Sequence, residues 1–166
     1  MEEGVVKFNM KPKKGVRYLE EVCGLEHKAE VIAGFLLETS GLDKRAVGEY
    51  LGEGDDFNKA VLYAYVDSIN FTDMSFDAAL RKFLSYFWLP GEAQKIDRMM
   101  EVFAAKFCSQ NRSVFPSADT AFVLAFSIIM LNTDLHNPAI KPERRMTKEG
   151  FRRNNRGISA GGDLED

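Results

Sequence analysis

The sequence has few of the residues from which metal sites and disulfide scaffolds are built. Its 166 residues include two cysteines and two histidines. Cys23 and Cys108 lie far apart, and neither His27 nor His136 has a second histidine or cysteine at ligand spacing. Metal centres and disulfide frameworks are therefore not indicated, and a reducing, intracellular setting fits best. We expect neither a metal nor a cofactor.

Nucleotide-binding loops and a strong charge imbalance are also missing. The sequence contains no Gly-x-x-x-x-Gly-Lys-Ser/Thr loop and no Gly-x-Gly-x-x-Gly turn after a strand, so the chain is not expected to bind nucleotide itself. The net charge is −3, whereas nucleic-acid-binding domains are usually distinctly basic. No nucleophile has a base with local sequence support, although a triad assembled from distant residues stays open.

Long hydrophobic runs are absent as well. The longest, Ala121 to Leu131 interrupted by Ser127, is shorter than the roughly 20 residues that cross a bilayer. The acidic start, Met1 to Gly4, lacks the apolar segment of a signal peptide. With 45% hydrophobic residues, the sequence predicts one soluble domain spanning residues 1–166.

What the sequence does contain is helical spacing of apolar residues, without period-two alternation or hairpin dipeptides. The fold class is therefore predicted as all-α. Asp43, Ser75 and Ser117 are candidate N-caps. Gly48, Gly52 and Gly54 are interpreted as helix ends. Helices are expected near residues 16–22, 31–36, 46–51, 56–68, 76–87, 96–107 and 117–137.

Two segments are predicted to be non-helical. Residues 1–14 show little periodicity and end in a basic stretch, Lys11 to Gly15, interpreted as a solvated entry to the first helix. Contact of this stretch with a phosphate-bearing partner or an anionic membrane is the alternative. Asn70 to Met74 is predicted as a polar turn.

A turn at Pro90-Gly91 separates two of the expected helices and places Glu92 in or next to the first turn of the second. Unpaired amides and the positive end of that helix favour an ionised carboxylate. Glu92 either only complements the helix dipole or is held out as a negative charge toward a partner. The local pattern leaves both interpretations open.

The expected helix at residues 117–137 is apolar almost all round. Full burial is the commoner outcome for such a helix, and an apolar face kept for a partner is the alternative. Polar residues at both ends would suit the rim of a groove. One stripe holds Leu124, Ile128, Leu131 and Leu135, and the other holds Phe122, Phe126, Ile129, Met130 and Thr133 and continues to Asn137.

Two extended motifs resemble the Sec-seven domain, the exchange domain of factors that activate Arf (ADP-ribosylation factor) small GTPases. One is Leu89 to Arg98 (LPGEAQKIDR), and the other joins Ala118 to Leu124 (ADTAFVL) with Ile129 to Pro138 (IMLNTDLHNP). The resemblance covers essentially residues 7–164. Shorter matches support it at residues 11–15, 48–52, 79–81 and 153–158.

This resemblance implies a right-handed superhelix of about eight to ten helices with a hydrophobic groove. Glu92 would be a glutamate finger that enters the nucleotide site of the GTPase, displaces its magnesium ion and takes over a phosphate-binding lysine. The reaction would be GDP release and GTP loading, without covalent chemistry. The residues expected to contact the GTPase are Asp119, Phe122, Phe126, Ile129, Met130 and Asn137.

The resemblance also implies a cytoplasmic protein acting in vesicle trafficking, peripheral to Golgi or endosomal membranes through its lipid-anchored GTPase. Brefeldin A traps complexes of some family members with GDP-bound Arf. Ser127, Asp134 and Met146 are similar to residues of sensitive members, whereas Phe126 stands where those members usually have tyrosine. Partial sensitivity is therefore expected.

Two departures from the family pattern accompany the match. Trp88 stands where the family usually has arginine, and residues 163–166 come where the family continues into another helix. The domain is therefore expected to lack its last C-terminal helix and to expose an apolar face. The alternative function is an exchange-inactive helical module that binds a GTPase or another partner helix in the same groove.

Overall fold

The computed structural model describes residues 1–159 and 161–164, so residues 165–166 of the predicted chain end lie outside the described residues. Across the described part of the chain no strand occurs, apart from an isolated bridge between Ser159 and Gly162. The all-α prediction is confirmed. The helices are α1 (Glu2–Met10), α2 (Pro12–Cys23), α3 (Ala29–Glu38), α4 (Lys44–Gly52), α5 (Asp56–Asp67), α6 (Phe76–Ser85), α7 (Ala93–Gln110), α8 (Ala118–His136), a 3-10 turn η1 (Pro142–Arg144) and α9 (Lys148–Asn154).

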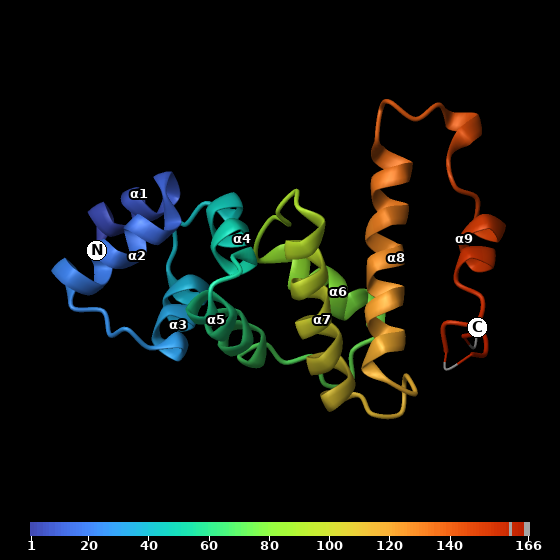
Figure 1. Cartoon of the computed structure of the whole chain (residues 1–166), viewed down its shortest axis with the longest axis horizontal. Coiled ribbons are helices and arrows are strands. Elements are labelled where there is room, and N and C mark those ends of the chain that lie inside the picture. The colour runs from blue at the N-terminus through green and yellow to red at the C-terminus, as the bar shows by residue number, and fades with distance from the viewer. Residues whose placement is uncertain (160, 165–166) are drawn as a thin grey trace.

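The helices follow one another along an elongated stack (Figure 1). The α1–α2 pair occupies one end, α3, α4 and α5 come next, and the α6–α7 layer leads to α8. The segment carrying α9 lies beyond α8, so the two termini are at opposite ends. Each layer packs mainly on its neighbours, which is how helices build a superhelical array.

The core at the centre of the stack is aromatic and is organised around Phe103 of α7. Its ring stacks on Phe83 at a centroid distance of 5.2 Å and meets the edge of Phe71 at 5.3 Å. All three side chains are fully buried. The turn predicted at Asn70 to Met74 is present, but it is not polar throughout, because Phe71 is a core residue.

The prediction of a non-helical N-terminus is also wrong. Residues 2–10 form α1, and α2 already begins at Pro12, the favoured first helical position for proline. The two helices pack closely because Gly15 has no side chain, and a Cβ there would lie 2.2 Å from the Phe8 backbone. Phe8 itself is fully buried, so α1 depends on this tertiary contact more than on its own weak periodicity.

The helix at residues 118–136 is long and apolar enough, by length and composition, to cross a membrane, so the exclusion based on run length was too strict. One such helix is weak evidence, because core helices of non-membrane proteins pass the same test. Here α8 packs along α7.

Candidate GTPase-binding site

The loop between α6 and α7, residues 86–92, is fixed to α4 by hydrogen bonds. Trp88 donates its backbone N–H to the carbonyl of Lys44 at 3.0 Å. The ammonium group of Lys44 in turn donates to the carbonyl of Ser85 at 2.7 Å. Next to Trp88, the fully buried ring of Phe87 meets Phe83 at 4.9 Å. We call residues 86–92 the finger loop.

Two glycines of α4 let the finger loop come close. A Cβ at Gly48 would lie 1.8 Å from the carbonyl oxygen of Trp88, which no side chain could tolerate. One helical turn later, a Cβ at Gly52 would lie 3.1 Å from Pro90. Gly48 therefore sits inside α4 because the loop packs there, and its interpretation as a helix end is wrong.

Glu92 is the N-cap residue of α7, as its predicted position requires, but its side chain does not cap the helix. Its backbone carbonyl accepts from the amides of Lys95 and Ile96, each at 3.1 Å. The carboxylate is 72% exposed and makes an ion pair with Lys95 at 3.3 Å. Because the Glu92 side chain takes no part in capping, its carboxylate is left to solvent and one lysine.

Lys95 joins this carboxylate to a second acidic residue. Its ammonium group lies 3.1 Å from Glu53, which also pairs with Lys13 of α2 at 3.3 Å. The hydrogen bond that Lys95 donates to the Glu53 carboxylate raises the pKa of Lys95. Burial pushes the pKa of Glu53 upward, but hydrogen bonds from Lys95 and Lys13 outweigh it and leave that pKa below its usual range. Lys95 therefore stays charged beside Glu92.

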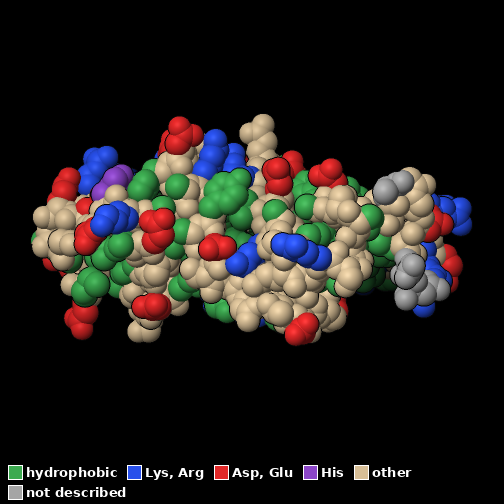
Figure 2. Space-filling view, turned by 90° about the horizontal axis from the view of Figure 1, so that it is seen from below, with side chains coloured by type: hydrophobic (Ala, Val, Ile, Leu, Met, Phe, Trp, Pro, Cys, Tyr) green, Lys and Arg blue, Asp and Glu red, His purple; other side chains and the backbone are tan. Residues whose placement is uncertain are grey.

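A cleft of about 400 Å³ lies between the finger loop and α4. Its walls carry charges of both signs together with the Trp88 ring, which lies over the Arg45 guanidinium at 5.7 Å. Charges of both signs are also mixed on the face shown in Figure 2, where acidic and basic side chains are interspersed along its length. No large patch of one sign is visible on that face.

The second predicted region, α8, packs on α7 and fully buries only small residues. Ala121 and Ala125 are fully buried, and with Thr120 they are the buried residues of this helix. Ser117 caps the helix by accepting from the Thr120 amide, as predicted. The large apolar side chains lie on either side of the Ala121–Ala125 line and stay partly exposed. α8 therefore keeps apolar surface exposed, as required by the alternative interpretation of this helix, in which one apolar face is kept for a partner.

One uncovered flank of α8 is the predicted contact stripe. Phe122 and Phe126 are half-buried, with ring centroids 6.3 Å apart, and Met130 is 54% exposed. Ile129 is half-buried between them in helical spacing, and Asp119 is exposed in the first turn. Five of the six predicted contact residues therefore share one face of α8. We call this face the α8 stripe.

The finger loop and the C-terminal half of the α8 stripe lie at the same end of the helix pair. α7 and α8 pack side by side and run in opposite directions, so the start of α7 and the finger loop before it lie toward the C-terminal half of α8, whose last turns extend beyond α7 (Figure 1). Asn137, the sixth predicted residue, is the C-cap of α8 at this end, and its side-chain oxygen accepts from the Ala139 amide at 2.9 Å.

The residues predicted to contact brefeldin A lie along α8 and the segment after it. The Asp134 carboxylate accepts from the backbone amide of Met146 at 2.6 Å, which joins two of the four directly. Ser127, like Phe126, is half-buried on α8. Sequence reasoning had not singled out Lys95 or Arg45. The three-residue spacing from Glu92 to Lys95 could have indicated the first ion pair, whereas Arg45 meets Trp88 only through the fold.

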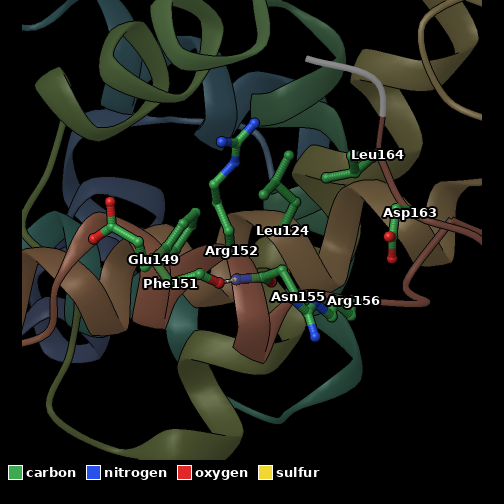
Figure 3. A pocket seen from close by; sticks show the side chains of 8 residues that line it. All are labelled: Leu124, Glu149, Phe151, Arg152, Asn155, Arg156, Asp163 and Leu164. Carbon is green, nitrogen blue, oxygen red and sulfur yellow. Dashed lines mark hydrogen bonds between the residues drawn. The ribbon is translucent and has the colours of Figure 1, made fainter.

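The other flank of α8 borders a larger cleft, of about 520 Å³, between α8 and the α9 segment (Figure 3). Leu124 enters it from α8, Phe151 and Asn155 come from the α9 side, and Leu164 closes one edge. The side-chain amide of Asn155 donates to the Phe151 carbonyl at 2.9 Å. None of the six predicted contact residues lines this cleft, so the two flanks of α8 form separate surfaces.

Comparisons with known proteins agree with this geometry. The family model of the Sec7 domain matches residues 1–166. "Brefeldin A-inhibited guanine nucleotide-exchange protein 3" of Arabidopsis thaliana is 54% identical over 164 residues, 99% of this chain and 9% of the relative. The human "Brefeldin A-inhibited guanine nucleotide-exchange protein 1" is 54% identical over 166 residues, 99% of this chain and 9% of the relative. The chain thus spans about a tenth of these relatives.

Solved structures show the same fold. The crystal structure of the Sec7p catalytic domain has 51% identity and a TM-score of 0.90, covering 99% of this chain and 88% of that one. A Sec7 domain bound to ARF1-GDP and brefeldin A has 39% identity and a TM-score of 0.88, covering 98% and 82%. With a family model matched over its full length, the chain belongs to the Sec7 (Sec-seven) domain family.

Proposed function

We propose that this domain is a guanine-nucleotide exchange factor that promotes GDP release from, and GTP loading of, an Arf-family small GTPase. The observation that carries the proposal is the pairing of an exposed carboxylate, Glu92, on a rigid loop with an uncovered apolar stripe at the same end of the α7–α8 pair. The solved Sec7 domain with ARF1-GDP supports this choice of partner.

The two features have different tasks in the proposed reaction. The α8 stripe supplies apolar area for binding, and about 25 cal/mol is gained for each Å² removed from water. Such binding alone would not favour the nucleotide-free GTPase over the loaded one. Discrimination between those two states has to come from a group whose interaction changes when the nucleotide leaves.

Glu92 is suited to that discrimination because its charge repels phosphate. A carboxylate brought to about 4 Å from a phosphate charge costs roughly 4 kcal/mol at an effective dielectric constant of 20. That energy corresponds to about three decades in nucleotide affinity. In the proposed reaction no covalent bond is made or broken, and the domain needs no metal or cofactor of its own.

The ion pair with Lys95 would hold Glu92 ready in the free domain. When the carboxylate enters the nucleotide site it must leave Lys95, whose charge remains compensated by Glu53 at 3.1 Å. The finger is thereby released without leaving a half-buried ammonium unpaired. Because Lys95 is shared with Glu53, breaking its pair with Glu92 costs less than it would if Glu92 were its single partner.

The proposed setting is the cytoplasmic side of Golgi or endosomal membranes, in vesicle trafficking. Membrane contact would be indirect, through the lipid-anchored GTPase. The relatives are far longer than this domain, so recruitment to one compartment is assigned to regions beyond the matched segment of such proteins.

The test is release of fluorescent GDP from an N-terminally truncated Arf, with the unmodified domain and two variants. Glu92→Lys is expected to reduce exchange by about three decades while complex formation with Arf persists. Phe126→Ala is expected to weaken complex formation as well as exchange. A matched charge control is Glu101→Lys, an exposed site further along α7, which should exchange normally.

The same assay separates the proposed function from the binding-module alternative. An unmodified domain that binds Arf but does not accelerate GDP release would refute the exchange function and favour the inactive module. Equal loss in Glu92→Lys and Glu101→Lys would show that net charge matters, and not the finger.

A further inference from the structure

Trp88 is a large apolar side chain left in solvent beside the proposed finger. It is the one tryptophan of the sequence and is 57% exposed, although its neighbour Phe87 is fully buried. The core at this point is therefore closed by Phe87, and the tryptophan ring is not needed for it. Exposed tryptophan is uncommon, and at interfaces tryptophan is over-represented among the residues that dominate binding.

The ring is exposed but its backbone is held firmly. The Trp88 N–H donates to Lys44, and its carbonyl lies against Gly48, where even a Cβ could not fit. The ring itself rests over the guanidinium of Arg45, at 5.7 Å from the ring centroid, which is a cation–π geometry. A side chain fixed in advance loses little conformational freedom when a partner docks on it.

Trp88 also shares its surroundings with the finger. It stands four residues before Glu92 on the finger loop, and both line the cleft of about 400 Å³ against α4. A GTPase whose nucleotide site received Glu92 would bring the surface around that site over this cleft. The exposed ring is therefore continuous with the proposed interface.

We propose that Trp88, supported by Arg45, is a second anchor for the Arf-type GTPase, contacting an apolar patch next to its nucleotide site. This inference rests on the proposed function. Glu92 would supply the repulsion that expels nucleotide, and Trp88 would supply affinity and partner selectivity at the same end of the domain. Because the anchor is an aromatic ring over a cation, it favours a GTPase with apolar side chains at that position over one with a lysine or arginine there.

The direct test uses the single tryptophan as a probe. The domain is produced with 5-fluorotryptophan, which gives one fluorine resonance, and unlabelled nucleotide-free Arf is added. Docking on Trp88 is expected to shift that resonance and to remove its solvent isotope shift between H2O and D2O. An unchanged resonance in a sample where gel filtration shows the complex would overturn the inference and leave the proposed function standing. Absence of any complex would overturn both.

Kinetics provide the second test. Trp88→Ala is expected to lower kcat/KM for exchange about tenfold, mainly by raising KM. Trp88→Phe should recover part of the loss. The control is Tyr63→Ala, which removes an aromatic side chain that is 62% exposed on α5. This variant should have the same kcat/KM as the unmodified domain.

The contribution of Arg45 is measured in a double-mutant cycle. Arg45→Ala is expected to lower kcat/KM a few-fold when Trp88 is present and to have no effect in Trp88→Ala, because Arg45 acts by positioning the ring. A loss of less than twofold in a folded Trp88→Ala, or equal losses in Trp88→Ala and Tyr63→Ala, would refute the anchor.

Discussion

Two neighbouring helices of nearly equal length use their apolar residues in opposite ways. α7 has 18 residues and α8 has 19. α8 is apolar almost all round, yet it buries only Thr120, Ala121 and Ala125. α7 buries Met99, Met100, Val102, Phe103, Ala104 and Phe107. Apolar composition therefore does not predict burial here, and the more apolar helix is the one with surface to offer a partner.

The difference follows from where the large side chains stand. On α7 the phenylalanines project into the aromatic core, with Phe103 against Phe71, Phe76 and Phe83. On α8 the buried positions are taken by the small residues Thr120, Ala121 and Ala125, and the larger apolar residues lie on either side of them. Phe122, Leu124, Ile128 and Ile129 are only partly buried against the core, so the flanks of α8 contribute less to it than the phenylalanines of α7 do.

The largest effect is expected from truncating one phenylalanine on each helix. Phe103→Ala should lower the free energy of unfolding by about 3–5 kcal/mol, because it empties a fully buried aromatic site. Phe126→Ala, at a half-buried site, should cost about 1 kcal/mol or less in stability. Urea unfolding followed by circular dichroism measures both.

Under conditions in which each variant is folded, exchange activity should fall more in Phe126→Ala than in Phe103→Ala. Phe126→Ala should weaken complex formation with Arf, while the folded fraction of Phe103→Ala should retain it. Similar losses of stability in the two variants would show that the α8 stripe belongs to the core and would remove the contrast between the helices.

The next prediction tests whether the finger loop packs tightly on α4. Gly48→Ala should destabilise the domain by about 1–3 kcal/mol, because its Cβ would meet the Trp88 carbonyl at 1.8 Å. Gly34→Ala, inside α3 with nothing within 4 Å, should instead stabilise by about 0.5–1 kcal/mol. Thermal unfolding of both variants measures the sign directly. If Gly48→Ala is as stable as Gly34→Ala, the loop does not pack on α4 as described.

A smaller effect is expected where α7 meets the finger. Lys95→Met should reduce kcat for exchange by up to about tenfold, with little change in KM, because the carboxylate of Glu92 is no longer held in place. Lys106→Met is the matched control: this lysine is also on α7, also has an 18% exposed side chain and pairs with Asp67 at 2.9 Å. Equal reductions in the two variants would assign the loss to general destabilisation of α7.

Local signals in the sequence predicted much of this fold. Asp43 and Ser117 cap their helices as predicted, each accepting a hydrogen bond from a backbone amide, whereas Ser75 stands at the N-cap of α6 without a side-chain cap hydrogen bond. The turn at Pro90-Gly91 places Glu92 at the start of α7. These features were predictable because each depends on a few adjacent residues, and caps and turns act within one helical turn.

Features set by tertiary contact were not predictable in the same way. α1 depends on the close approach of Phe8 to Gly15, and Gly48 lies inside a helix because a loop distant in sequence packs there. For α8, periodicity alone favours full burial. The sequence of one helix does not predict how much of its surface the neighbouring helices cover. The site roles of Glu92 and of the α8 stripe came from the family resemblance, and they stay predictions until exchange is measured.

The smallest expected effect concerns a single hydroxyl on the α8 stripe. Brefeldin A should inhibit the domain partially, and Phe126→Tyr should lower the inhibitor concentration for half-inhibition about fivefold, because one added hydrogen bond contributes about 1 kcal/mol. Phe122→Tyr, on the same face with its ring 6.3 Å away, is the matched control and should leave inhibition unchanged. Inhibition of GDP release from Arf, titrated at fixed domain concentration, gives both values. An unaltered response of Phe126→Tyr would mean that the inhibitor does not reach this part of the stripe, and a gain equal to that of Phe122→Tyr would mean that polarity of the face matters and position 126 does not.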